Sequence, residues 1–198
     1  MRKLTAADYV PMPWKNGGGS TTQLAVSPSS AGLDNFDWRI STAQIATGGP
    51  FSFFPGVDRS LAVLRGRLSI VADDEPAFLL TAGNEVFVFR GEQQIETELP
   101  DGPLADFNVM TRRARCEHAL QAIQIHGSLE FKQRADQVFA YIAHGSLQCR
   151  NATGESMHCD KGESLLLDRS ESARILLSSA SATVYIARIT FKDEHHVQ

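Results

Sequence analysis

The segment Trp14–Thr21, with the sequence WKNGGGST, places an aromatic ring, a cation and an amide directly before three glycines. Side chains of these types can hold a small polar ligand, and the glycines leave the adjoining backbone free to adopt positive φ and to approach a ligand closely. The segment is therefore a candidate binding loop. On its own residues, an equally good interpretation is a glycine-rich connection in which Trp14 fills the core while Lys15 and Asn16 face water.

Two other segments carry polar residues at alternate positions, which is the spacing of one face of a strand. Arg39 and Ser41 alternate with apolar residues in the first segment, and Asp106 and Asn108 do so in the second. In an antiparallel sheet, such a polar face normally contacts solvent. The simplest interpretation is therefore that both faces are ordinary solvent-exposed surfaces.

The alternative places both polar faces at the mouth of a barrel. Arg39, Arg59 and Lys15 would then lie opposite a single acid, Asp106. Because a planar guanidinium group binds a carboxylate in bidentate geometry, the expected ligand is a small carboxylate. Amide and hydroxyl groups would pair with its other donors and acceptors, and rings would cover a planar part. The predicted ligand-binding residues are Trp14, Lys15, Asn16, Arg39, Ser41, Phe51, Arg59, Asp106 and Asn108.

Catalysis is the competing class of function. Asp106 could act as a general base, but adjacent arginines are expected to lower its pKa and keep it ionised, so that it orients an arginine instead. The chain lacks a Gly-x-Ser-x-Gly elbow and a P-loop, and no histidine precedes His118 to activate a serine. We therefore favour binding and assign no catalytic residue. The alternatives are a metal-independent isomerase or lyase acting on a small acid, and a structural module whose barrel is filled by apolar side chains.

Composition narrows the classes of partner. The 198 residues carry a formal net charge of −4, which argues against nucleic acid, and no apolar run is long enough to span a membrane. The amino terminus lacks the apolar core of a secretory signal. Cys116, Cys149 and Cys159 show no Cys-x-x-Cys spacing, which is typical of reduced thiols. We expect a soluble cytoplasmic protein without a nucleic-acid or membrane partner.

Short apolar or alternating runs separated by turn residues predict an all-β sandwich or barrel. Long amphipathic helical patterns are missing, and the segment Glu117–Ile125 fits either a short helix or a strand. The predicted strands are Phe36–Ile45, Ser60–Val71, Glu85–Phe89, Leu104–Met110, Gln137–Ile142, Ser164–Leu167, Ala173–Leu177 and Thr183–Phe191.

An internal repeat organises these strands. Gly66 and Gly83 are 17 positions apart, as are Gly145 and Gly162, and the second pair follows the first at an offset of 79 residues. The apolar runs that flank the glycines align at the same offset. The chain is therefore predicted to hold two tandem copies of one β unit.

Each copy resembles the cupin pattern, a small β-barrel. The run from Gly83 to Gly91 departs from the second cupin motif only where Phe89 replaces a proline. A metal-binding cupin supplies a glutamate from its first motif and histidines from both motifs. In this chain Arg59 stands at the glutamate position and Gln94 at the second-motif histidine position. The resemblance therefore implies a first barrel without metal or other cofactor.

Four segments in the first 113 residues together resemble the HutD/Ves family of bicupins. They are Met12–Thr21, Asp37–Ser41, Gly49–Leu61 and Asp106–Arg113. The resemblance implies a cytoplasmic, metal-free bicupin of two tandem cupin-type β-barrels (double-stranded β-helix). Residues 1–115 would form the barrel with the ligand pocket and residues 116–198 a degenerate second barrel.

In the HutD branch, the resemblance further implies control of histidine utilisation through binding of a pathway intermediate of the urocanate or formylglutamate type. Two chains could pair as a homodimer through exposed strand edges, as β-barrel proteins often do.

We expect elemental analysis of the purified protein to find no stoichiometric transition metal, because the first barrel has no histidine and carries Arg59 and Gln94 at cupin ligand positions. About one tightly held metal per chain, removed by a chelator with loss of function, would contradict this expectation.

Overall fold

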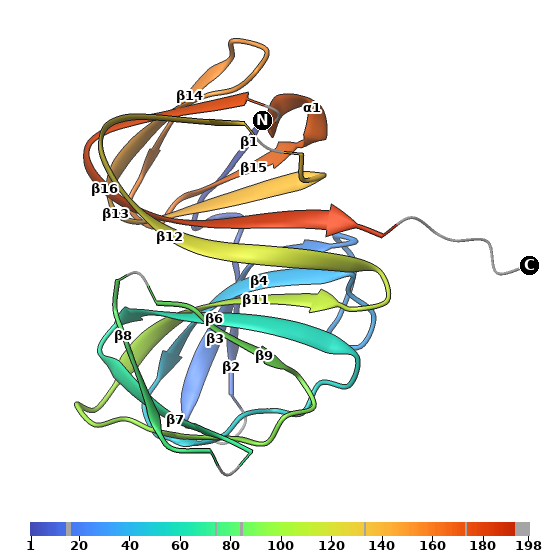
Figure 1. Ribbon diagram of the computed structural model, residues 1–198, viewed down its shortest axis with the longest axis vertical. Helices are drawn as coiled ribbons and strands as arrows, with labels where there is room; N and C mark the ends of the chain where they lie inside the picture. Colours follow the sequence, from blue (N-terminus) through green and yellow to red (C-terminus); the bar gives the residue numbers. More distant parts are fainter. Residues whose placement is uncertain (15–16, 74, 84, 133, 173, 193–198) are drawn as a thin grey trace, which may run out of the picture.

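The computed structural model describes residues 1–14, 17–73, 75–83, 85–132, 134–172 and 174–192. Two β-rich halves are stacked along the long axis of the molecule (Figure 1). Within the described residues the single helix is the short α1 (Arg169–Ser172), so the all-β prediction is confirmed. No described helix has the length and apolar character needed to cross a bilayer.

The first half contains two antiparallel sheets. The described strands of the larger sheet, in spatial order, are β2 (Val10–Pro13), β3 (Gly19–Ser27), β4 (Trp38–Ile45), β11 (Leu104–Arg112), β6 (Val57–Arg65) and β9 (Phe87–Arg90). Those of the smaller sheet are β5 (Gly49–Pro50), β10 (Ile95–Glu98), β7 (Arg67–Ala72) and β8 (Phe78–Thr81).

The second half is built on one antiparallel sheet. Its described strands, in spatial order, are β1 (Arg2–Leu4), β15 (Ser164–Asp168), β13 (Gln137–Arg150), β16 (Arg174–Phe191) and β12 (Cys116–Lys132), with β14 (Ser156–Asp160) paired to β13. The first strand of the chain thus pairs within the sheet of the second half. The division into domains at residue 115 stays a prediction.

The strand order repeats between the halves. The path β4-β11-β6-β9 of the first half recurs as β12-β16-β13-β15 in the second. The segment Glu117–Ile125, for which helix and strand were both open, lies in β12, and the last two predicted strands merge into the long β16. Gly66 (φ 90°) and Gly145 (φ 74°) occupy matching places with positive φ. A Cβ at Gly145 would lie 2.0 Å from the carbonyl oxygen of Ser181, so only glycine fits there.

The halves pack face to face through an aromatic cluster. The Phe107 ring lies 5.4 Å from that of Tyr141 and 5.6 Å from that of Tyr185, between ring centroids. The Tyr185 hydroxyl donates to the carbonyl of Val63 (3.1 Å), and the Trp38 indole N–H donates to Gln137 (2.9 Å). Burying each large apolar side chain contributes about 1.5–3 kcal/mol. The face of β4 and β11 opposite the predicted polar residues is therefore buried, not wet.

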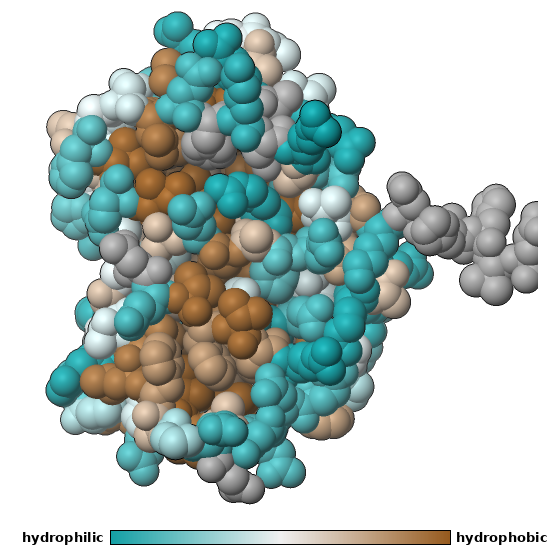
Figure 2. All heavy atoms as spheres, viewed as in Figure 1, coloured by the Kyte–Doolittle hydropathy of each residue, from teal (hydrophilic) through white to brown (hydrophobic). Residues whose placement is uncertain are grey.

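Apolar side chains are also exposed on the face of the first half seen in Figure 2, where β8 and β9 lie in Figure 1. Phe78 and Leu79 of β8 and Val88 of β9 are among the exposed large apolar residues. Both strands lie at the ends of their sheets in the described structure. Pairing of two chains through such edges stays a prediction.

His118 of β12 joins the two halves by hydrogen bonds. Its Nε2 lies 2.9 Å from Ser60 Oγ and its Nδ1 lies 2.7 Å from Thr111 Oγ1. Burial lowers the pKa of His118 from 6.5 to about 4, with a partial offset from the negative charge of Asp58. The imidazole is therefore neutral at neutral pH, with one nitrogen as donor and the other as acceptor.

We predict that His118 makes the protein less stable in acid. As the pH falls from 6.5 toward 4, the unfolded chain takes up a proton on this histidine that the folded protein does not, so the free energy of unfolding decreases. Between about pH 7.5 and about pH 5, the wild type should lose about 2 kcal/mol more than His118→Gln in urea unfolding. An equal loss in both proteins would contradict the prediction.

Candidate functional site

A cavity of about 640 Å³ lies inside the first half, against the inner face of β3, β4, β6 and β11. Its volume is in the range of small-molecule pockets. Seven of the nine predicted ligand-binding residues line it, namely Trp14, Arg39, Ser41, Phe51, Arg59, Asp106 and Asn108. The other two, Lys15 and Asn16, lie outside the described residues.

The register of the strands brings the two arginines together. Met110 of β11 pairs with Arg39 of β4 on one side and with Arg59 of β6 on the other. Residues directly opposite one another in a ladder share a face, so both arginines point to the side of the sheet that lines the pocket. Their exposed fractions are only 6% and 7%. The pocket thus has a cationic end.

The next positions along β11 extend this polar wall. Asn108, two residues before Met110, pairs with Ser41, and Asp106, two residues earlier again, pairs with Ala43. All share the pocket face because side chains alternate along a strand. The wall therefore runs from two guanidinium groups through an amide and a hydroxyl to a carboxyl group.

Arg39 is held by its neighbours on the same wall. Its Nε donates to Gln23 Oε1 (2.8 Å), and its Nη1 lies 3.5 Å from Ser41 Oγ. Burial lowers the pKa of Arg39 from its ordinary value. These contacts fix the guanidinium group at the edge of the pocket.

Arg59 is enclosed by aromatic rings. Its guanidinium carbon lies 5.2 Å from the ring centroid of Phe51, 5.5 Å from that of Phe54 and 4.7 Å from that of Phe89. Its Nη1 donates to the carbonyl of Ser52 at 3.4 Å. Cation–π contacts of this kind contribute about 0.5–2 kcal/mol each and hold the fork in one orientation.

The charge of Arg59 is only partly compensated. Burial, and to a smaller extent the positive charge of Arg39, lower the pKa of Arg59 to about 10, while Asp106 acts in the opposite direction. At neutral pH the group is still protonated. Its Nε is buried and has no hydrogen-bond partner in the described structure.

Asp106 departs from the sequence-based expectation. Its carboxylate accepts a hydrogen bond from the backbone N–H of Ala43 (3.0 Å), and no ion pair within 4.0 Å joins it to Arg39 or Arg59 in the described structure. Burial raises its pKa from 3.8 to about 7, against the opposing effects of Arg59 and of the Ala43 N–H. The prediction that arginines keep this pKa low was wrong, because desolvation of the 3% exposed carboxyl group outweighs their attraction.

The glycine-rich segment positions the Trp14 ring. A Cβ at Gly19 would lie 2.4 Å from the carbonyl oxygen of Gln44 and 3.1 Å from two atoms of the Trp14 ring. The indole N–H of Trp14 donates to Thr21 Oγ1 (2.8 Å). Trp14 packs against the core and also lines the pocket, so its position is compatible with both sequence interpretations, and the binding role of the segment stays a prediction.

Among its described residues, the second half has no comparable polar wall. Its ladder repeats the pairing of the first, but Val138, Val184 and Ile186 stand at the positions that match Arg59, Asp106 and Asn108. All three belong to a cluster of buried apolar residues that fills the interior. The apolar filling that would indicate a purely structural barrel thus describes the second half and not the first.

The sequence profile of the HutD family matches residues 6–185. The chain belongs to the HutD family. It is 35% identical over 156 residues to an uncharacterized 21.2 kDa protein in the hutC 3′ region of Pseudomonas putida, covering 78% of this chain and 80% of that one. It is 37% identical over 106 residues to protein Ves of Citrobacter koseri, covering 52% and 54% of the two chains.

Solved structures support the same assignment. HutD from Pseudomonas fluorescens SBW25, whose structure was determined in a formate condition, superposes with a TM-score of 0.82 at 30% identity, over 96% of this chain and 98% of that one. A cupin 2 conserved barrel domain protein from Leptotrichia buccalis superposes with a TM-score of 0.58 at 11% identity, over 96% and 100% of the two chains, and shows the fold alone. The predicted cupin fold of this HutD-family chain is confirmed, although its sheets are open and not closed cylinders.

Sequence reasoning missed several residues of the pocket of this HutD-family chain. Met110 shares the face of Asp106 and Asn108, so the alternation that selected those two could have selected it. Phe54 and Leu33 reach the pocket from segments between strands, where no periodicity predicts direction. In the part of the chain that the structure describes, no group of three or more His, Cys, Asp or Glu side chains is arranged to hold a metal.

We predict that Asp106→Asn stabilises the protein at alkaline pH. Since the folded pKa of Asp106 lies above that of the unfolded chain, stability falls as the pH rises from 3.8 to about 7, and the full cost applies above that range. At about pH 8 the variant should gain as much as ~4 kcal/mol in free energy of unfolding, and at about pH 4 almost nothing. Asp101→Asn, which removes an exposed partner of Arg67, serves as control. A gain independent of pH would contradict the prediction.

Proposed function

We propose that this protein binds a small carboxylate in the pocket of the first half and acts as a cytoplasmic regulator of histidine utilisation. The ligand would be a pathway intermediate of the urocanate or formylglutamate type. The observation that carries the proposal is Arg59, a buried cation on the pocket wall whose Nε has no hydrogen-bond partner in the described structure.

The charge balance of the pocket favours an anion. Two guanidinium groups face one carboxyl group whose pKa is raised to about 7, so the wall has a net positive charge at neutral pH. Buried charge without a close counter-ion is costly, and a bound carboxylate would supply that counter-ion in a medium where charge-assisted hydrogen bonds are strong.

The apolar part of the pocket favours an acid with a planar or unbranched body. Trp14, Phe51 and Phe54 provide aromatic surface next to the cationic end. Such rings bury a flat ligand efficiently while the polar groups fix its orientation.

A role in histidine utilisation is supported by the relative from the hutC 3′ region, which matches most of this chain. Binding of a pathway acid would let such a protein sense the flux through the pathway. Sensing of this kind requires no turnover of the ligand.

Asp106 favours one alternative function. A buried carboxyl group with a pKa of about 7 in a ligand pocket is suited to proton transfer, as a metal-independent isomerase or lyase acting on a small acid would require. Recovery of the bound acid unchanged after long incubation at high protein concentration would exclude this alternative for that acid. Turnover that Asp106→Asn abolishes, while binding persists, would establish it.

We expect Arg59→Ala to weaken binding of urocanate and of N-formylglutamate by about 100-fold or more in calorimetry, since a charge-assisted pair inside the pocket is lost. Arg59→Lys should restore little of the affinity, because a point charge cannot reproduce the guanidinium fork.

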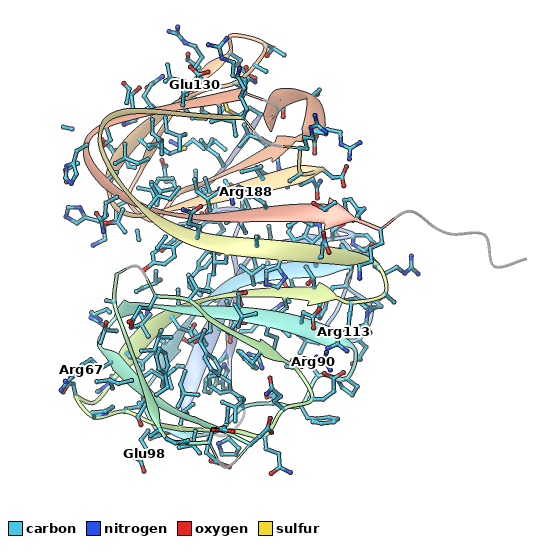
Figure 3. The ribbon with its side chains drawn as sticks, viewed as in Figure 1. Arg67, Arg90, Glu98, Arg113, Glu130 and Arg188 are labelled. Carbon is cyan, nitrogen blue, oxygen red and sulfur yellow. The ribbon has the colours of Figure 1, made fainter. Side chains whose placement is uncertain are left out.

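The matched control is Arg90→Ala. Arg90 lies on β9, next to Phe89 in sequence, but is exposed, and it is labelled with other exposed arginines such as Arg67 in Figure 3. Arg90→Ala should bind both acids like the wild type. Unchanged affinity of folded Arg59→Ala would overturn the assignment of Arg59.

A further inference from the structure

Two buried polar side-chain atoms lack a hydrogen-bond partner in the described structure, Arg59 Nε and Asn108 Oδ1. Both residues line the pocket, and their exposed fractions are 7% and 8%. Leaving a buried polar atom unpaired costs about 1–3 kcal/mol. A ligand that forms hydrogen bonds with both atoms would remove this cost at both positions of the pocket wall.

The two atoms demand opposite chemistry from the ligand. Arg59 Nε carries a hydrogen and can only donate, whereas Asn108 Oδ1 can only accept. An ionised carboxylate offers acceptors alone, so it can satisfy Arg59 but not Asn108. The ligand therefore needs a donor in addition to its carboxylate.

The strand register bears on the spacing between the carboxylate and the donor of the ligand. Arg59 lies opposite Met110, and Asn108 lies two residues from Met110 along β11. Positions two residues apart on one strand are about 6.5–7 Å apart. The two side chains therefore leave the sheet at different ladder positions, and a donor several bonds from the carboxylate suits that separation. Asp106, one further step along the same face, places another acceptor in the same direction when it is ionised.

We propose that the pocket selects small carboxylic acids that carry an N–H donor several bonds from the carboxylate, with the carboxylate at Arg59 and the N–H at Asn108 Oδ1. The inference rests on the proposed function and defines the class of its ligand. The ring N–H of urocanate and the amide N–H of N-formylglutamate both meet the requirement. Acids without such a donor leave Asn108 unpaired.

Matched pairs of acids test the proposal. Urocanate is compared with 3-(2-furyl)acrylate, which has the same acrylate and a five-membered ring without N–H. N-formylglutamate is compared with N-formyl-N-methylglutamate, in which a methyl group replaces the amide hydrogen. In calorimetry on the wild type, the N–H member of at least one pair should bind about tenfold tighter or more than its partner.

The variant Asn108→Leu removes the acceptor while keeping a side chain of similar size. It should bind the N–H acid about tenfold more weakly and its partner without loss, so that the preference disappears. Asn108→Asp retains an acceptor and should retain the preference even if its overall affinity changes. Thermal unfolding of each variant verifies the fold.

The outcomes distinguish failure of the N–H requirement from failure of the carboxylate pocket. Equal affinity of the members of both pairs, with binding still lost in Arg59→Ala, would overturn the N–H requirement and leave the carboxylate pocket standing. A preference that persists in folded Asn108→Leu would overturn the role of Asn108. Failure of all four acids to bind the wild type would overturn the proposed function and this inference with it.

Discussion

The ladder β4-β11-β6 is buried on both faces, and this double burial determines the rest of the structure. One face carries Trp38 and Phe107 and packs against the second half, while the opposite face carries Arg39, Arg59 and Asp106 and encloses the pocket. Antiparallel sheets usually leave one face to water. Here the second half covers the face that would otherwise contact water. The apolar contacts on that face hold the strands together, so the inner face of the first half can carry polar side chains.

The two halves share one strand order but differ in the polarity of their interiors. At matching ladder positions, Arg59, Asp106 and Asn108 keep the first interior polar and hollow, whereas Val138, Val184 and Ile186 fill the second. A filled interior adds stability, and a polar one reduces it through desolvation of charge. Desolvation also raises the pKa of Asp106 and lowers the pKa of Arg59. The second half thus acts as the scaffold on which a destabilising polar wall is held.

The sequence predicted more of the pocket lining than strand alternation alone would suggest. Alternation correctly grouped Arg39 with Ser41 and Asp106 with Asn108, but it could not tell which face was wet, because it assumes a solvent side that this sheet does not have. The family resemblance supplied the inward direction.

What the sequence missed depends on three-dimensional distances. The pKa of Asp106 is set by its depth, the contact of His118 with Ser60 crosses between the halves, and Phe54 reaches the pocket from outside the strands. The most direct test of the account is a crystal structure of the protein with urocanate. We predict that the carboxylate lies inside the first-half pocket, within hydrogen-bond distance of the Arg59 guanidinium group. Urocanate bound elsewhere, or bound in this pocket with its carboxylate away from Arg59, would contradict it.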